Sequence, residues 1–186
     1  MSFRYEIRLS GEGGQGMILA SIIFAEAAAI YEGKNVVQSQ VYGPASRGGA
    51  TKAEVIISDE EIDYPKATSL DFLLALTQEA CDKYWKDLKE GGILVVDSSR
   101  VHTVPQGNFT IYRVPIIETA REKIGKEIVT NIVSLGVITP LIGIVSPEMV
   151  EQAINDHVPK GTEALNRQAF HAGLELGQLL KNARTA

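Results

Sequence analysis

The sequence predicts an α/β domain with a mostly parallel sheet and a helical C-terminal third. It begins with a strand, a glycine turn and a helix, and strand and helix patterns then alternate as far as residue 114. Beyond that point only helical patterns follow, and this order of elements is typical of α/β folds. With 186 residues, of which 45% are hydrophobic and 22% charged, the chain is expected to form one domain, residues 1–186.

The first unit is the one around which the other elements are expected to pack. Residues 5–9 alternate apolar and polar side chains with the period of a strand, residues 11–16 form the turn, and residues 16–30 form a helix. Between Met17 and Ile30 the helix carries only two polar side chains, Ser21 and Glu26. We therefore expect other elements to cover most of its surface.

The remaining elements follow from the same two periodicities. Strands are predicted at 35–41, 52–58, 71–76, 92–97 and 109–114, and helices at 78–89, 117–124, 128–144, from 146 onwards, and at 161–181. Thr77 is a suitable N-cap for the helix at 78–89, with Gly91 past its end. In the last helix the buried face is predicted to consist of Leu165, Ala169, Ala172, Leu176 and Leu179. Gly173 and Gly177 indicate close contact with a neighbouring element.

The glycine turn has the spacing G-x-G-x-x-G, formed by Gly11, Gly13 and Gly16, with Gly14 as an additional glycine. It follows a strand and opens a helix, which is the context required of a dinucleotide-binding turn. The positive end of the helix dipole would face into the turn and favour an anion.

One part of a dinucleotide site is missing. An acidic residue normally binds the ribose about 20 residues after the turn, but no Asp or Glu lies between Glu32 and Glu54. A P-loop is also excluded, because Met17 follows the last glycine where a lysine is required. Two interpretations of the turn remain open: a bound phosphate group, or glycines that permit close packing of helix and strand.

A second segment, residues 33–53, contains Lys34, Arg47 and Lys52 but no acidic residue, although the chain as a whole is acidic. Arg47 lies between Gly43-Pro44 and Gly48-Gly49, in a loop that we expect at the carboxyl edge of the sheet. An arginine there suits a phosphate or carboxylate. Alternatively, Arg47 pairs with an acid of this or another chain, and in either case the loop is a contact surface.

Composition excludes several classes of function. The net charge of −5 gives no electrostatic support for binding nucleic acid. A single cysteine excludes an internal disulfide and an iron–sulfur cluster held by this chain alone. The N-terminus carries charge where a signal peptide needs an apolar run, and no apolar stretch reaches transmembrane length. A cytoplasmic protein is therefore expected.

No arrangement of residues predicts a catalytic group or a metal site. His102, His157 and His171 lack the neighbours of a triad or a zinc site. Cys81 is either a structural thiol or one with a pKa lowered by a helix start. Asp97 ends a strand at the edge where α/β sheets bind ligands, and is either a ligand-facing acid or the acid of a turn at Ser98-Ser99.

Several segments resemble the gamma subunit of 2-oxoacid:ferredoxin oxidoreductases nearly end to end. The matching segments are G-E-G-G-Q-G (11–16), Q-V-Y-G-P-A-S-R-G-G (40–49), A-E-V-I-I-S-D (53–59), L-K-E-G-G-I-L-V-V-D (88–97), N-I-V-S-L-G (131–136) and N-R-Q-A-F-H-A-G (166–173). The combination of the first two segments is specific. The 2-oxoglutarate type is the most similar, followed by the pyruvate, branched-chain oxoacid and indolepyruvate types.

The resemblance implies a Rossmann-like three-layer domain in an oxidoreductase of anaerobic metabolism. Such complexes decarboxylate a 2-oxoacid oxidatively, forming an acyl-CoA and reducing ferredoxin. They use thiamine diphosphate, coenzyme A, iron–sulfur clusters and magnesium, none of which is expected to be held by this chain alone. The implied partners are the thiamine-binding alpha and beta subunits and a ferredoxin-like subunit, with no nucleic acid and no membrane.

The resemblance also implies which residues contribute to function. Two loops are expected to face the coenzyme A approach and a subunit interface: Gly13, Gly14, Gln15 and Gly16 in the first, and Tyr42, Gly43, Arg47, Gly48 and Gly49 in the second. A gamma subunit is expected to supply no catalytic residue. The alternative is a stand-alone nucleotide-binding protein or an NADP-dependent dehydrogenase, in which Arg47 meets the 2′-phosphate.

Overall fold

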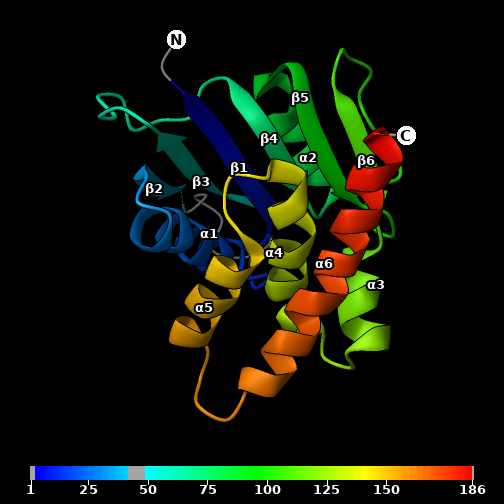
Figure 1. The fold of residues 1–186 in the computed structure, drawn as a ribbon. Coiled ribbons are helices and arrows are strands. Elements are labelled where there is room, and N and C mark those ends of the chain that lie inside the picture. The colour runs from blue at the N-terminus through cyan, green and yellow to red at the C-terminus, as the bar shows by residue number, and fades with distance from the viewer. Residues whose placement is uncertain (1–2, 42–48, 186) are drawn as a thin grey trace.

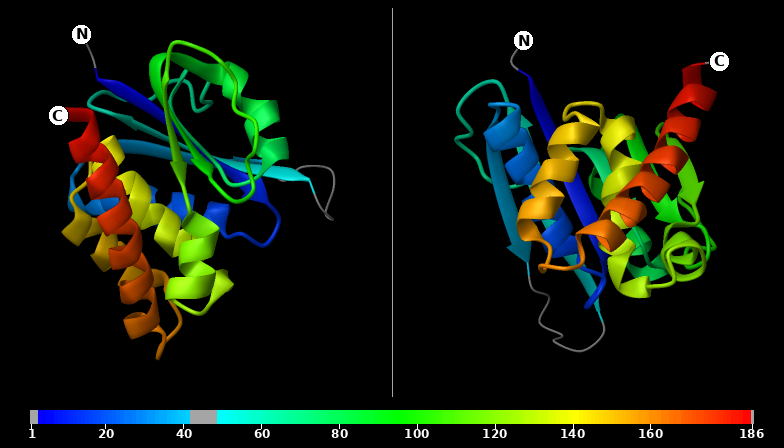
Figure 2. Two further views of the ribbon diagram at one scale, coloured as in Figure 1. Left: turned by 90° about the vertical axis from the view of Figure 1, so that its right-hand side faces the viewer. Right: turned by 60° about the horizontal axis from the view of Figure 1, so that its bottom comes forward.

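The computed structural model describes residues 3–41 and 49–185, which form a six-stranded sheet with helices on both faces (Figures 1 and 2). The strands are β1 (Arg4–Glu12), β2 (Asn35–Val41), β3 (Ala50–Ser58), β4 (Leu70–Ala75), β5 (Leu88–Asp97) and β6 (Thr110–Val114). Their order across the sheet is β2-β3-β1-β4-β5-β6. Strands β1, β4, β5 and β6 run parallel, whereas β3 is antiparallel to both of its neighbours. The predicted α/β architecture with a mostly parallel sheet is confirmed.

The helices divide unequally between the two faces of the sheet. They are α1 (Met17–Glu26), which continues as a π-helical turn η1 (Ala27–Tyr31), α2 (Gln78–Tyr84), α3 (Ile116–Glu118), α4 (Thr130–Ile142), α5 (Pro147–His157) and α6 (Glu163–Thr185). Short turns complete the set: η2 (Trp85–Asp87), η3 (Thr119–Lys123) and η4 (Glu127–Val129). Helices α1, α3, α4, α5 and α6 cover one face and α2 covers the other (Figure 2). The larger core lies on the first face and the smaller one on the α2 face. The three-layer arrangement and the helical C-terminal third are thus confirmed.

The position of β3 departs from a dinucleotide-binding sheet. From β1 the chain passes through α1 to the edge strand β2 and then returns as β3 between β2 and β1. Strand β2 is therefore two strand spacings, roughly 10 Å, from β1. The antiparallel register places Ala50 opposite Glu12, so that the start of β3 lies beside the end of β1.

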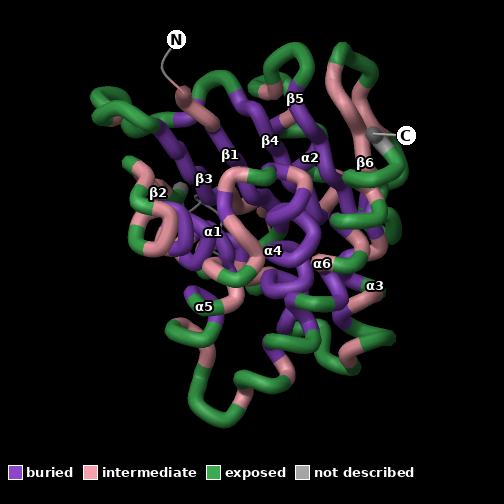
Figure 3. Tube along the Cα trace, viewed as in Figure 1, coloured by how far each residue is buried: buried purple, intermediate pink, exposed green. Residues whose placement is uncertain are grey.

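Helix α4 lies between the sheet and α6 and is buried along nearly its whole length (Figure 3). Glycines permit this close approach of the two helices. A Cβ on Gly173 would lie 2.1 Å from the carbonyl oxygen of Val133, and one on Gly177 would lie 2.4 Å from that of Val137. The predicted close contact at these glycines is confirmed.

Two predictions about the helices are wrong. Leu179, which was predicted to be buried, is 67% exposed. In this part of α6 the packed face is formed by Gly173, Gly177 and Leu180 instead. The helix predicted at 78–89 ends at Tyr84, and β5 begins at Leu88 because this residue pairs with Leu70. Gly91 therefore lies inside a strand, at an irregularity in its register, and does not end a helix. The N-cap is confirmed: the Thr77 hydroxyl accepts a hydrogen bond from Ala80 N at 3.3 Å.

On the α2 face, charged side chains join β1 to β3. Arg8 is 1% exposed, and its Nε and Nη2 donate to Glu54 Oε1 at 2.9 and 2.7 Å. Its Nη1 pairs with Asp87, and its guanidinium lies 5.3 Å from the ring centre of Tyr84. Lys52 Nζ lies 2.8 Å from the same oxygen of Glu54. This buried cluster ties together the two strands that carry the glycine turn and the start of β3.

The cluster predicts a dependence of stability on pH. Burial alone would raise the pKa of Glu54, but hydrogen bonds from Lys52 and Arg8 outweigh it and hold the pKa below the ordinary 4.5. A carboxyl group with a lowered pKa stabilises the fold above about pH 4.5, and this contribution is lost as the pH falls through the folded-state pKa.

We expect the Glu54→Gln variant to have a flatter profile of unfolding free energy between about pH 5 and 3 than the unsubstituted chain. Urea unfolding across this range measures the profile, with Glu60→Gln at an exposed position as the control. Equal slopes for the Glu54→Gln and Glu60→Gln variants would refute the assignment.

Candidate functional site

The glycine turn joins the carboxyl end of β1 to α1 and is closed by its own hydrogen bonds. The side-chain oxygen of Gln15 accepts from Glu12 N at 2.9 Å, and Gln15 N donates to Glu12 O at 3.3 Å. Gly14 and Gly16 have φ angles of 93° and 74°, in the left-handed region that side chains other than glycine rarely adopt. Gln15 therefore holds the turn together, and the two glycines give it its shape.

Helix α4 contacts this turn through its first residues. A Cβ on Gly16 would lie 2.8 Å from Nδ2 of Asn131, which is itself 6% exposed. The missing side chain of Gly16 thus makes room for the start of α4. This glycine has a packing role that does not depend on any ligand.

The N-terminal end of α1 is left without a side-chain cap. Its N-cap residue is Gly16, which has no side chain to cap the helix, and the first turn contains no acid. The N–H groups of such a turn carry partial positive charge. An anion fits this end of the helix.

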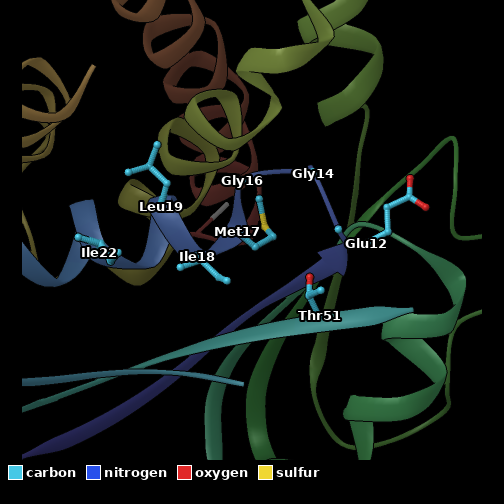
Figure 4. Close-up of a pocket in the computed structure, with 9 residues that line it drawn as sticks. Glu12, Gly14, Gly16, Met17, Ile18, Leu19, Ile22 and Thr51 are labelled. Carbon is cyan, nitrogen blue, oxygen red and sulfur yellow. The ribbon is translucent and has the colours of Figure 1, made fainter. Parts of the chain in front are cut away.

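An apolar depression of about 460 Å³ lies between the turn, α1 and β3 (Figure 4). Its lining residues are Glu12, Gly13, Gly14, Gly16, Met17, Ile18, Leu19, Ile22 and Thr51. The expectation that other elements cover most of α1 holds for the side facing the core. On the other side, Leu19 is 37% exposed and Ile30, in the following turn, 67% exposed.

Of the second predicted loop, only Gly49 is described. Tyr42, Gly43, Arg47 and Gly48 lie outside the described residues. Gly49 is partly buried and shares a depression of about 400 Å³ with Glu12, at the carboxyl edge of the sheet.

Asp97 and Cys81 do not face a ligand. The Asp97 side chain is buried, and its Oδ1 accepts from Ser99 N at 2.9 Å and from Arg100 N at 3.1 Å. Its Oδ2 accepts from Ile117 N at 2.8 Å. The turn-acid interpretation of Asp97 is confirmed. Burial raises the pKa of the Cys81 thiol to about 11, so the interpretation of a low-pKa thiol is wrong.

The three histidines do not form a site. Nε2 of His157 lies 3.1 Å from a carboxylate oxygen of Glu26, and that of His171 lies 3.1 Å from one of Glu151. His102 lies in the segment after β5, where its backbone N donates to Gln78. Within residues 3–41 and 49–185, no group of three or more His, Cys, Asp or Glu side chains is placed to hold a metal ion. No helix in the same part of the chain has the length and apolar character needed to cross a membrane.

Comparison with known proteins decides the family. Residues 6–176 match the family model described as pyruvate ferredoxin/flavodoxin oxidoreductase. The chain belongs to this family. It is 52% identical to 2-oxoglutarate synthase subunit KorC of Methanocaldococcus jannaschii over 182 residues, which cover 97% of each chain.

Solved structures support the same assignment. The gamma subunit of a keto/oxoacid ferredoxin oxidoreductase from Geobacter sulfurreducens is 56% identical, with a TM-score of 0.88 over 95% of this chain and 98% of that chain. A 2-oxoglutarate:ferredoxin oxidoreductase from Magnetococcus marinus shares the fold, with a TM-score of 0.85 at 24% identity over 95% of this chain and 31% of that chain. The protein is therefore a gamma subunit of a 2-oxoacid:ferredoxin oxidoreductase complex. Nothing in these comparisons supports a stand-alone dehydrogenase.

The sequence reasoning missed two features of this gamma subunit at the carboxyl edge. Asn131 is the first residue of the N-I-V-S-L-G segment, but no pattern in the sequence indicates its contact with Gly16. Arg100 was not singled out, although an Asp-Ser-Ser-Arg sequence after a strand signals a turn in which Asp97 fixes the backbone of Arg100.

Proposed function

We propose that this gamma subunit serves a 2-oxoglutarate-type complex, in which 2-oxoglutarate is oxidatively decarboxylated to an acyl-CoA with reduction of ferredoxin. This subunit contributes a docking surface for a thiamine-binding subunit and one wall of the path by which coenzyme A reaches the active site. It contributes no catalytic group. The observation that carries the proposal is the apolar depression that continues directly into an uncapped glycine turn. The high identity to a 2-oxoglutarate synthase subunit supports the choice of oxoacid.

The docking surface consists of Ile18, Leu19, Ile22 and Ile30, which we call the α1 surface. Leu19 and Ile30 are exposed, and Ile18 and Ile22 are partly buried at the depression. Apolar side chains left exposed along one helix and its last turn are typical of a protein–protein contact, because they cost free energy in water.

The opposite side of the helical layer has a different character. Lys123 pairs with Glu175 at 2.9 Å and Arg167 with Glu151 at 3.0 Å, and all four side chains reach the surface. Burying these ion pairs in an interface would cost the free energy of their hydration. This charged side is therefore expected to remain exposed to solvent. The contrast favours the α1 surface as the docking site.

The glycine turn fits a phosphate group of coenzyme A. The uncapped start of α1 offers N–H groups and the positive end of a helix dipole. Gly13 has no described atom within 4 Å of the place where a Cβ would stand, so the turn is open to an approaching ligand. The second loop, with Tyr42, Gly43, Arg47 and Gly48, is predicted to complete this border.

The other cofactors of the reaction would be held elsewhere in the complex. Thiamine diphosphate with magnesium would supply the carbanion chemistry, and iron–sulfur clusters would accept the electrons. The single cysteine, Cys81, is buried in the small core and cannot ligate a cluster. We assign thiamine diphosphate and magnesium to the alpha and beta subunits and the clusters to a ferredoxin-like subunit, in the cytoplasm.

The test of the docking surface is Leu19→Gln compared with Leu179→Gln, since both remove an exposed leucine from a helix. Leu19 is 37% exposed, so burying the rest of its side chain contributes about 0.5–1 kcal/mol. A glutamine amide buried there without a partner costs about 1–3 kcal/mol more, so we expect Leu19→Gln to weaken assembly with the partner subunits by about tenfold or more. Thermal unfolding of the isolated subunit should change little in either variant.

Assembly is measured by titrating the subunit into the purified partner subunits, and activity by 2-oxoglutarate-dependent ferredoxin reduction with coenzyme A. Leu179→Gln is expected to behave as the unsubstituted chain. If the two variants assemble equally well, the α1 surface is not where the partner docks. If pyruvate supports faster turnover than 2-oxoglutarate, the assignment of the oxoacid is wrong.

A further inference from the structure

Arg100 is unlike the other arginines of the chain. Among the arginines whose side chains the structure describes, it is the one whose guanidinium makes no hydrogen bond or ion pair with residues 3–41 or 49–185. The others bond as follows: Arg4 to Glu6, Arg8 to Glu54 and Asp87, Arg113 to the carbonyls of Val101 and His102, Arg121 to Glu122, and Arg167 to Glu151. The unpaired charge of Arg100 is exposed at the surface.

The backbone around Arg100 is nevertheless firmly held. On its N-terminal side, the buried carboxylate of Asp97 accepts from Ser99 N at 2.9 Å and from Arg100 N at 3.1 Å. On its C-terminal side, Gln78 Oε1 accepts from His102 N at 2.9 Å and from Thr103 N at 3.1 Å. Because the backbone of this segment is already fixed, binding an anion orders only the Arg100 side chain and no further part of the loop.

Arg100 also lies where α/β sheets bind ligands. It follows β5 and lines the depression of about 400 Å³ that contains Glu12, the last residue of β1, and Gly49. Ligands of open α/β sheets bind outside the carboxyl ends of the strands. The glycine turn begins directly after Glu12, so the arginine and the turn border the same edge.

Two carboxylates line the same depression, and one oxygen of each accepts a hydrogen bond from a group other than Arg100. Glu79 Oε1 accepts from Ala50 N at 3.2 Å, and Glu12 Oε1 accepts from the side-chain amide of Gln15 at 3.5 Å. Neither forms an ion pair with Arg100, so the guanidinium keeps its donors for a ligand.

We propose that Arg100 binds the phosphate groups of coenzyme A at the carboxyl edge of the sheet. The planar guanidinium donates two parallel hydrogen bonds to a phosphate, a contact that a lysine cannot reproduce. This assignment rests on the proposed function, because it takes the anion to be the coenzyme that approaches this edge. The other anion of the reaction is the carboxylate of the oxoacid, and the experiment distinguishes the two sources.

The test uses Arg100→Ala in the assembled complex, with Lys86→Ala as the control. Lys86 precedes β5 at the opposite edge of the sheet and is also exposed, so both substitutions remove one positive charge. We expect Arg100→Ala to raise the KM for coenzyme A about tenfold, with the KM for 2-oxoglutarate unchanged. With pantetheine, which carries no phosphate, as the acceptor thiol, the two variants should have equal KM values. Arg100→Lys should recover only part of the loss.

Two results would overturn the proposal: equal KM values for coenzyme A in the Arg100→Ala and Lys86→Ala variants, or a change confined to the KM for 2-oxoglutarate. The second would assign Arg100 to the oxoacid carboxylate. A change of equal size with pantetheine would likewise refute phosphate binding. Failure of the unsubstituted subunit to support coenzyme A-dependent turnover would refute the proposed function instead.

Discussion

Replacing Arg8 by methionine is expected to lower the free energy of unfolding by about 3 kcal/mol. Arg8 is 1% exposed, and it neutralises Glu54, which is 5% exposed. Methionine keeps most of the side-chain volume but leaves the Glu54 carboxylate with Lys52 as its one cationic partner among the described residues. Removing one partner of a buried ion pair is costly because the remaining charge is still desolvated. Guanidinium chloride unfolding of the isolated subunit measures the loss.

A double substitution separates the charge from the packing. In Arg8→Met with Glu54→Gln, the uncompensated carboxylate is absent, so we expect this variant to be more stable than Arg8→Met alone. Arg121→Met is the surface control, because Arg121 pairs with Glu122 and both are exposed, and it should change stability by less than about 0.5 kcal/mol. A loss in the double variant equal to the sum of the two single losses would show that the pair is not coupled.

Local patterns in the sequence predicted most of the elements. The apolar run in β4 and the alternation in β1 have the correct period, and Thr77 caps α2 as its side chain suggested. The predicted ends of elements were less accurate where pairing with a residue distant in sequence determines where the element ends. Helix α2 ends at Tyr84 because Leu88 pairs with Leu70 across the sheet, and no residue near position 85 announces this pairing.

The antiparallel insertion of β3 was not predicted, although the sequence contained a signal for it. Only eight residues, 42–49, separate β2 from β3. A crossover between parallel strands needs about a dozen residues or more, so a short glycine-rich connection indicates antiparallel neighbours. An alternating pattern identifies a strand but does not show whether it runs parallel or antiparallel to its neighbours. Periodicity alone therefore does not predict that β3 is inserted antiparallel between β2 and β1.

The candidate site was predicted in part. The glycine turn could be found because its spacing is local. The open side of α1 could not, because a helix that is apolar all round does not show which face other elements leave uncovered. The unpaired state of Arg100 also depends on residues distant in sequence, such as Glu12 and Glu79, because only the fold decides which acids come within reach of its guanidinium.

Gly173→Ala is expected to destabilise the protein by about 3 kcal/mol, against the sign that helix propensity predicts. In an isolated helix, alanine is more favourable than glycine by about 1 kcal/mol. In α6, however, the added Cβ would lie 2.1 Å from the carbonyl oxygen of Val133 and 3.1 Å from Cα of Gly136. These are backbone atoms of a helix packed on the sheet, so they cannot turn away as a side chain would. Gln178→Ala, at an exposed position of α6, is the propensity control and should be neutral or slightly stabilising.

The effect of Gly173→Ala should reach the glycine turn, because α4 connects the two. Val133 lies in the same helix as Asn131, whose amide contacts Gly16 at the start of α1. A shift of α4 away from α6 would press Asn131 against the turn, where Gly16 leaves space for it. We therefore expect the residual folded Gly173→Ala subunit to show faster hydrogen exchange at the N–H groups of α1 as well as α6. If the Gly173→Ala variant is as stable as the unsubstituted chain or more stable, α4 and α6 can move apart without destabilising the fold. The proposed effect of this substitution on the glycine turn would then be refuted.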